Sequence, residues 1–394
     1  MRVRLHLDIG WADLFSVFAP LREGRAALEA RVRDAWQEHA APALSVRTAF
    51  DALLTSLALP QGAPVLMSAV TIQNMADVVR AHGLTPVAVD IELDTLAPRA
   101  ADVDRALVAS GAALYVHAHL YGARNDLADI AAICRARSAL LVEDCAQGYT
   151  GAPPIEPPNA DVSFYSFGPI KARTCLGGAV ALFRDRDRAA AVRALLAAHA
   201  PMPESWLRAR ALKYAVLKLA SAPALYGALV GALRIAGVDH DAALGAAARG
   251  FRGDLIQAIR RAPSRTLLRL LARRTGERNA VRWRERAGCI MDAALQDVFE
   301  RPGHAAGGQA YWLYPVLVMD PAEGANSMRA AGFDATRGAT SLRALSGENA
   351  DLLMRHVLYL PLAPGMNERE LGRMTKTLLE HVAPLRVNEG RIAA

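Results

Sequence analysis

A lysine in a glycine-rich loop gives this chain a group that could do chemistry on a carbonyl. Lys171 lies between two runs of β-forming residues, 162–167 and 179–183, and the pair Gly177-Gly178 follows it. A lysine at the edge of a core has a lowered pKa because burial disfavours its charge, and a neutral amine can form a Schiff base. A solvated lysine in a loop between strands is the plain alternative.

A carboxylate stands at a second position where ligands collect. Asp144 ends the apolar run 140–143, and Gln147 follows three residues later. In open α/β sheets, ligands bind at the carboxyl ends of the strands. A carboxylate there suits the ring nitrogen of pyridoxal phosphate, which it keeps protonated so that the ring can accept electrons. A cap on a helix or turn is the alternative for Asp144 alone.

Taken together, these segments resemble the DegT/DnrJ/EryC1/StrS sugar aminotransferases, which are pyridoxal-phosphate enzymes of fold type I. The similarity keeps its order from about residue 24 to residue 379, except across a middle insertion. The matching segments are 89–96 (VDIELDTL), 117–122 (HAHLYG), 143–147 (EDCAQ), 166–171 (SFGPIK), 177–178 (GG) and 358–362 (LYLPL).

The resemblance implies a role for each matching residue. Lys171 would bind pyridoxal 5'-phosphate covalently and then move protons as general acid and base. Asp144 would hold the ring nitrogen and Gln147 the ring hydroxyl, while Ser166 and Thr48 would hold the phosphate. Relatives that dehydrate sugars carry histidine at the lysine position, so Lys171 favours transamination.

Two positions depart from the family pattern. The family has Ser-Gly-Thr where this chain has 45–48 (SVRT), so Arg47 replaces the glycine. Arg47 could add charge to a phosphate site or block the approach of the backbone, and we expect phosphate binding to be retained, with Thr48 capping the next helix. Ile72 replaces an aromatic residue that stacks on the cofactor ring, which gives up the aromatic contact.

Two further residues are candidates for substrate contacts. Arg337 lies in the segment 333–342, near which a family loop enters the active site, and could bind a carboxylate or phosphate; a surface arginine is the alternative. Tyr121 belongs to the matching segment 117–122. No metal site is predicted, because the run 239–241 (DHD) is typical of a turn and helix cap.

The pattern of elements predicts an α/β protein. The 394 residues are 53% apolar, which allows a substantial core. Short apolar runs alternate with helical stretches, which favours a mostly parallel sheet covered on both faces. The expected strands are 43–46, 64–68, 85–89, 112–117, 140–143, 162–167, 179–183 and 311–318, and the expected helices are 25–38, 48–59, 71–82, 101–110, 125–136, 185–199, 279–299, 324–331 and 368–381.

The resemblance adds the domain plan. It implies fold type I, in which a large domain over residues 1–200 contains a mostly parallel, seven-stranded sheet. A smaller α+β domain follows over residues 276–394. Residues 201–275 form a helical insertion that fits the family least well.

The insertion has an unusual composition. Residues 201–290 hold 17 Lys and Arg against 6 Asp and Glu, a net charge of +11 in a chain whose total is +7. The stretch 219–233 has no charge, but its 15 residues are fewer than the roughly 20 that a membrane-spanning helix needs. Residues 211–236 could lie on a membrane surface, or they could form a helical hairpin on the protein or between subunits.

The sequence therefore predicts a pyridoxal-phosphate aminotransferase. By resemblance, the donor would be glutamate or glutamine and the acceptor a nucleotide-linked keto-sugar, in cell-surface polysaccharide or secondary-metabolite biosynthesis. The same chemistry on a lipid-linked substrate and a non-catalytic scaffold are the alternatives.

A homodimer is expected by resemblance. Four scattered cysteines and charges near residue 1 favour a cytoplasmic protein, peripheral to the membrane if 211–236 bind it, and nothing indicates a nucleic-acid partner.

Overall fold

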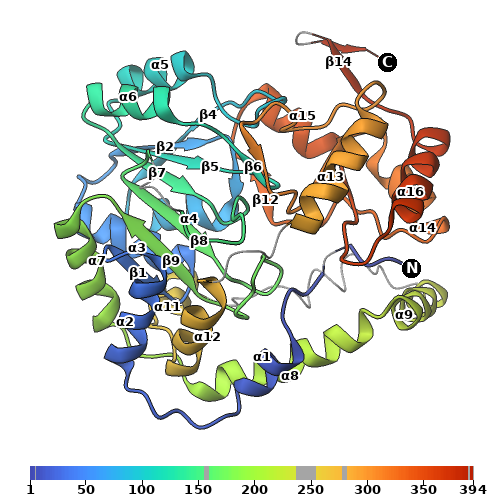
Figure 1. Cartoon of the computed structure of the whole chain (residues 1–394). Helices are drawn as coiled ribbons and strands as arrows, with labels where there is room; N and C mark the ends of the chain where they lie inside the picture. Colours follow the sequence, from blue (N-terminus) through green and yellow to red (C-terminus); the bar gives the residue numbers. More distant parts are fainter. Residues whose placement is uncertain (5, 155–158, 237–253, 277–281, 389–390, 394) are drawn as a thin grey trace.

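The structure is a computed structural model, and it describes residues 1–394 except 5, 155–158, 237–253, 277–281, 389–390 and 394. The turn predicted at 239–241 lies outside the described residues. Two bodies of secondary structure lie side by side in Figure 1, with a long helix, α8, running below both.

A seven-stranded sheet forms the larger body and confirms the predicted α/β class. Six of the seven strands run in the same direction, whereas β9 runs antiparallel to both of its neighbours. Across the sheet, the strands are β1 (Ala40–Ala43), β9 (Ala179–Phe183), β8 (Val162–Ser166), β7 (Leu140–Asp144), β5 (Leu114–Ala118), β2 (Pro64–Ser68) and β4 (Thr85–Val89). Because side chains alternate along a strand, successive residues enter cores on opposite faces.

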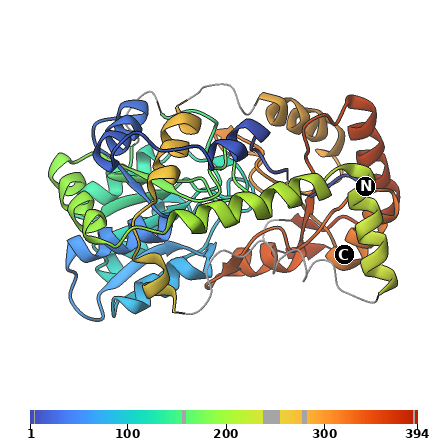
Figure 2. The same ribbon diagram turned by 90° about the horizontal axis from the view of Figure 1, so that it is seen from below.

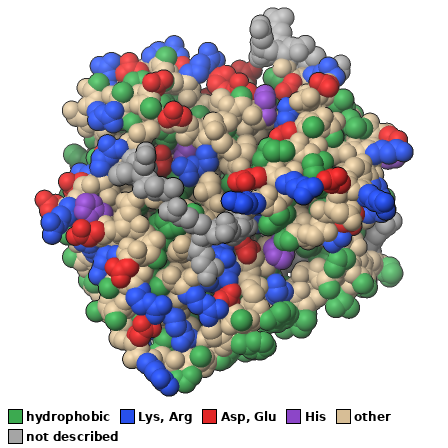
Figure 3. Space-filling view, in the orientation of Figure 1, with side chains coloured by type: hydrophobic (Ala, Val, Ile, Leu, Met, Phe, Trp, Pro, Cys, Tyr) green, Lys and Arg blue, Asp and Glu red, His purple; other side chains and the backbone are tan. Residues whose placement is uncertain are grey.

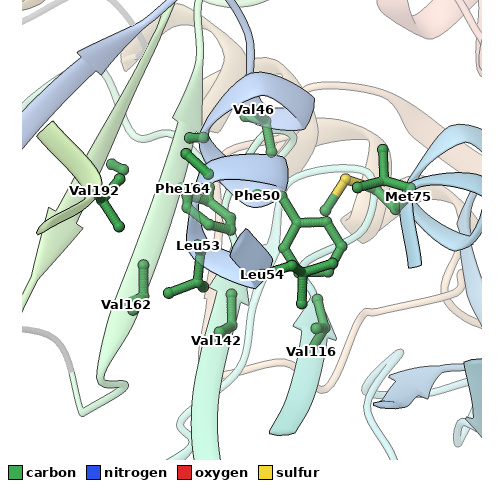
Figure 4. Close-up of a cluster of buried hydrophobic side chains, with 14 of the residues drawn as sticks. Val46, Phe50, Leu53, Leu54, Met75, Val116, Val142, Val162, Phe164 and Val192 are labelled. Carbon is green, nitrogen blue, oxygen red and sulfur yellow. The ribbon is translucent and has the colours of Figure 1, made fainter. Parts of the chain in front are cut away.

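One face of the sheet packs against three helices, α3 (Val46–Leu57), α4 (Gln73–Ala81) and α7 (Arg186–Ala198). Figure 4 shows Phe50 and Leu53 of α3 packed over Val142 of β7 and Phe164 of β8. All four side chains are fully buried. This packing fixes where α3 begins relative to the ends of β7 and β8, which is the position that a ligand site requires.

The opposite face is covered in two parts. Helices α5 (Ala100–Ser110) and α6 (Ala128–Ala136) cover β2, β5 and β7. Helices α2 (Arg25–Trp36) and α12 (Arg265–Thr275) pack against each other beside β8 and β9. Trp36 lies there among aromatic rings, 4.8 Å from the ring centre of Tyr165 and 5.9 Å from that of Phe167.

The smaller body is built around an antiparallel pair, β11 (Tyr314–Leu317) and β13 (Val357–Leu360). Its helices are α13 (Arg282–Leu295), α14 (Pro321–Ala330), α15 (Glu348–His356) and α16 (Glu368–His381), and its last strands are β14 (Arg386–Asn388) and β15 (Arg391–Ala393). Two short strand pairs join it to the larger body: β12 (Leu342–Ala344) with β3 (Val70–Ile72), and β10 (Gly308–Gln309) with β6 (Ala123–Arg124).

The insertion is helical in its described part. It contains α8 (Glu204–Ala220), α9 (Pro223–Ile235) and α11 (Leu255–Ile259), and α8 packs against the short N-terminal helix α1 (Trp11–Ser16). Figure 2 shows α8 extended along the lower side of the molecule, with α9 turning away at its end. No single described helix is both long and apolar enough to cross a membrane; α8 and residues 223–233 pass that test only as a pair, across a bend of 92°.

Two element boundaries differ from the predictions near residue 45. The strand predicted at 43–46 is β1, which ends at Ala43, and the helix predicted from Thr48 begins at Val46. The prediction that Thr48 caps α3 is wrong, because the Ser45 hydroxyl accepts the backbone N–H of Thr48 and takes that role. Likewise, the helix predicted from residue 71 begins at Gln73, because Val70–Ile72 pair with β12.

The chain's N-terminal residues fasten the smaller body and α9 together. Arg4 is buried and donates to both carboxylate oxygens of Asp334, each at 2.7 Å. Asp334 also accepts the hydroxyl of Tyr226 from α9, and the Arg4 guanidinium donates to Thr336. Removing one partner of a buried ion pair lowers folding stability, because the other charge stays buried without compensation. We therefore expect the loss of Arg4 or of Asp334 to destabilise the protein.

We predict that Arg4→Met lowers the free energy of unfolding by about 3 to 5 kcal/mol, because it leaves Asp334 buried and uncompensated. The matched control is Arg286→Met, which removes the exposed pair with Glu368 and changes stability by less than about 1 kcal/mol. Urea denaturation followed by circular dichroism measures both. Equal losses in the two variants would contradict the buried-pair argument.

Candidate active site

The predicted residues gather at the carboxyl ends of two neighbouring parallel strands. β7 ends at Asp144, β8 ends at Ser166, and the two strands are paired through Asp144 and Phe164. The loop after β8 carries Lys171 and returns to β9 through Gly177-Gly178. This is the edge of the sheet at which α/β proteins bind ligands, so the fold supports the site proposed from the sequence.

Lys171 has its amine in a poorly solvated place. Its Nζ lies 3.8 Å from the ring centre of Trp312. Burial lowers the pKa of Lys171 to about 7; Asp144 opposes this shift and Arg47 adds to it. Near neutral pH the amine is therefore partly deprotonated, which is the form that attacks carbonyls and accepts protons.

Asp144 is the carboxylate within electrostatic reach of that amine. It is buried, and its Oδ1 accepts the backbone N–H of Ala146 at 2.9 Å. Burial raises the pKa of Asp144, while this hydrogen bond and the charges of Lys171 and Arg47 oppose the rise. A carboxyl at a strand end, with a cationic amine nearby, matches the charges that the family resemblance implies.

Two arginines add positive charge to the same place. Arg47 lies in the first turn of α3, donates to the side chain of Asn74 at 3.1 Å, and has its pKa lowered to about 10 by burial. Asp144 and Arg210 both act on it electrostatically. Arg210 comes from α8, where its Nε donates to the carbonyl of Leu176 at 2.8 Å. Sequence reasoning missed Arg210 because its helix lies in the insertion, where the resemblance is weakest.

Gln147 and Tyr121 are joined by a hydrogen bond. The side-chain oxygen of Gln147 accepts the backbone N–H of Tyr121 at 2.9 Å. Tyr121 has a positive φ of 58°, and its hydroxyl accepts that of Tyr359 at 3.1 Å. Both candidates thus lie in one hydrogen-bonded unit beside the site. Their contacts with a cofactor or substrate remain predictions.

Ser166 and Thr48 have different surroundings. A Cβ built on Gly168 would lie 3.8 Å from the Ser166 hydroxyl and 3.9 Å from Cγ of Lys171, so the turn holds these two residues near each other. The Thr48 hydroxyl donates to the carbonyl of Ile259 at 2.9 Å. The backbone of α11 thus already engages Thr48, and its role in phosphate binding remains a prediction.

The last two candidates, Ile72 and Arg337, lie at the periphery of the candidate site. Ile72 ends β3 opposite Leu342 of β12 and is partly buried. Arg337 is exposed and acts electrostatically on Asp320 at the start of α14. This exposed position favours the surface alternative for Arg337.

Trp312 is a site residue that sequence reasoning missed. Its indole N–H donates to the carbonyl of Ile170 at 2.9 Å, which places the ring against the amine of the next residue. The segment before β11 is held by two backbone hydrogen bonds, Ala310 to Gly122 at 2.8 Å and Leu313 to Tyr121 at 2.9 Å. The aromatic pair Tyr311-Trp312 was the available signal, but it was assigned to a strand.

A second buried cluster lies behind Asp144. Ligand atoms of His119, Glu143 and Cys145 lie within 4.8 Å of one another, a spacing that would suit a metal ion. However, the guanidinium of Arg124 lies within electrostatic reach of Glu143 and Cys145, and they raise its pKa. The arginine already supplies the cation that these groups require, so we assign no metal there.

Residues 24–213 match the model of the DegT/DnrJ/EryC1/StrS aminotransferase family. That segment is 190 of the 394 residues, and it is similar to this family. The finding confirms the resemblance seen in the motifs, and the matched segment holds Lys171, Asp144, Gln147, Ser166 and Arg47.

A curated relative and several solved structures extend the comparison. An L-glutamine:2-deoxy-scyllo-inosose aminotransferase from Micromonospora echinospora is 31% identical over 132 residues, which are 32% of this chain and 31% of the relative. The chain thus matches about a third of that protein's length. The structure of the aminotransferase TlmJ from Streptoalloteichus hindustanus has a TM-score of 0.68 at 20% identity and covers 96% of this chain and 98% of its own.

A third comparison concerns the fold alone. The structure of PseC from Helicobacter pylori, an aminotransferase involved in the biosynthesis of pseudoaminic acid, has a TM-score of 0.69 at 14% identity, and the match covers 96% of this chain and 98% of PseC. These structures confirm fold type I over 96% of the chain, a share that extends well beyond the family match. The domain boundaries at 200 and 275 remain predictions.

We predict that Gly122→Ala displaces the loop that carries Trp312. Gly122 has a φ of +113°, and an added Cβ would lie 2.6 Å from the backbone nitrogens of Tyr311 and Trp312. The expected result is a loss of about 1 to 3 kcal/mol in stability, with a change in tryptophan fluorescence. Gly372→Ala in α16 is the control, because nothing lies within 4 Å of its added Cβ. An unchanged Gly122→Ala spectrum would contradict this assignment.

We also predict a pH-dependent contribution of Lys171 to stability. Between pH 7 and about 10 the unfolded chain holds a proton on this lysine that the folded chain has lost, so unfolding takes up a proton and stability rises with pH. In the ligand-free protein the rise reaches about 1.4 kcal/mol per pH unit at most. Lys171→Met should abolish this slope, whereas Lys376→Met, an exposed lysine, should keep it. Identical slopes in all three proteins would show that Lys171 has an ordinary pKa.

Proposed function

We propose that this chain is a pyridoxal-phosphate aminotransferase that aminates a keto-sugar. The observation that carries the proposal is the pairing of Lys171, with its pKa lowered to about 7, and the buried carboxylate of Asp144 on the neighbouring strand end. An amine that is partly neutral at working pH can act as nucleophile and as general base. A buried acid beside it supplies the opposite charge.

The charges of the site fit the cofactor. Among the described residues that act on one another electrostatically here, three are cations, Lys171, Arg47 and Arg210, and one is a carboxylate, Asp144. A phosphate would balance this excess at the N-terminal end of α3, where backbone dipoles also favour an anion. Arg47 in place of a glycine therefore supports phosphate binding, because it lies among these charges.

Three residues of the chain would each have a separate role in the reaction. Pyridoxal phosphate, when bound, supplies an electron sink for the amino-group transfer. Lys171 would hold it and afterwards carry a proton on Nζ. Asp144 would face the ring nitrogen and keep it protonated. Trp312 excludes water on one side of the Lys171 amine, which keeps the amine's pKa low.

The substrate class is supported by the named relatives. The curated relative is named for glutamine as donor and 2-deoxy-scyllo-inosose as acceptor. One structural neighbour was solved with its TDP-sugar product, and another is a GDP-4-keto-6-deoxymannose-3-dehydratase. The fold thus accommodates both amination and dehydration. The lysine at 171 favours amination, and we propose glutamine or glutamate as donor and a nucleotide-linked keto-sugar as acceptor.

The proposal is tested by absorbance and mass spectrometry. With added pyridoxal phosphate, the wild-type protein should gain a bound violet absorbance band that glutamine or glutamate bleaches, and borohydride should fix the cofactor on the peptide containing Lys171. Lys171→Ala should lose both the fixation and the bleaching. Lys376→Ala should behave as the wild type. A band that neither donor bleaches would refute transamination and leave the scaffold alternative.

A further inference from the structure

The exposed apolar side chains of this protein are concentrated on one surface. Among the described residues, twelve large apolar side chains are exposed, and nine of them belong to α1 and the two residues after it or to α8 and α9. On α8 and α9 they are Leu212, Val216, Leu219, Leu225, Leu229 and Ile235. Figure 3 shows apolar atoms gathered along the lower edge, where Figure 1 draws α8, and farther right toward α9. We call these helices together the α1–α8–α9 surface.

The N-terminal helix contributes aromatic side chains to this surface. Trp11, Phe15 and Phe18 are 39%, 68% and 43% exposed. α1 packs against α8, so the two helices form neighbouring parts of the surface. The acid of this helix, Asp13, is buried and pairs with Arg273 and Arg274. Exposed tryptophan and phenylalanine on a folded surface are typical of proteins that contact the interface of a lipid bilayer.

After Glu204, the first residue of α8, the charges of α8 and α9 are all positive. Residues 205–236 contain five Lys and Arg and no Asp or Glu. Arg208 and Lys213 are exposed on α8, next to Leu212 in the sequence. Cations at the border of an apolar face fit the headgroups of anionic phospholipids, each contributing attraction near the membrane surface.

The helices are anchored to the protein by their other faces. Leu207, Ala211 and Tyr214 of α8 and Tyr226 and Val230 of α9 are buried. The pair could not become surrounded by lipid without breaking these contacts. This one-sided burial favours helices that lie on a membrane with their exposed faces in its outer layer.

A second copy of this chain would fit the surface less well. In a two-fold symmetric contact the same patch meets itself, so exposed cations would face cations. Residues 205–236 offer no carboxylate to balance them. We propose that the α1–α8–α9 surface docks on an anionic phospholipid membrane. Because α8 also brings Arg210 within electrostatic reach of Arg47, docking would bring the candidate site close to the membrane.

Vesicle flotation of the full chain tests this proposal. The protein should float with vesicles containing phosphatidylglycerol and phosphatidylcholine, and less with phosphatidylcholine alone or in high salt. Leu212→Gln/Val216→Gln/Leu225→Gln should reduce binding by about tenfold or more, because it removes apolar contacts without touching the core. Arg208→Gln/Lys213→Gln should reduce binding only to the anionic vesicles.

The matched control is Val108→Gln, which changes a residue of α5 that is 60% exposed and should leave flotation unchanged. Absence of binding to anionic vesicles would overturn the proposal. So would sedimentation analysis in which the triple variant dissociates a dimer, since the surface would then be an interface between copies. Cofactor binding, read from the violet band, should be the same in every variant, so failure of docking and failure of the proposed chemistry can be told apart.

Discussion

The structure depends on the removal of water from one amine. Lys171 is a cation in the unfolded chain, yet in the folded chain burial lowers its pKa to about 7. Three distant parts of the chain create this environment: Trp312 covers the amine, while Asp144 and Arg47 oppose each other electrostatically. Every large feature of the fold, from the parallel sheet to the strand pairs that join the two bodies, serves to bring these groups to one edge.

The insertion takes part in this site although it resembles the family least. α11 engages Thr48 through the carbonyl of Ile259, and α8 brings Arg210 within electrostatic reach of Arg47. Positive charge at the site is thus supplied by Arg47 and by a helix outside the motifs. The same helix presents apolar residues on its other side, so the site and the α1–α8–α9 surface are two faces of one element.

The predictable parts of the fold were those with strong local patterns. The strands at 64–68, 85–89 and 179–183 and the helix at 368–381 were predicted with their observed bounds. Errors occurred where hydrogen bonding decided the boundary. Ser45, not Thr48, caps α3, because the Ser45 hydroxyl accepts the free backbone N–H of Thr48. The helix therefore begins at Val46, two residues before the predicted start. Ile72 stays in a strand because it pairs with Leu342, more than 250 residues away by numbering.

By itself the sequence indicated the resemblance to the family, the α/β class and the lysine and acid to propose for the site, because these follow from residue types at short, fixed spacings. Only the tertiary structure decided what surrounds them. Trp312 lies against Lys171 because backbone hydrogen bonds join its segment to Gly122 and Tyr121, and Arg210 enters from a separate helix. Such contacts depend on how distant elements pack, and that packing sets the solvation that gives Lys171 its lowered pKa.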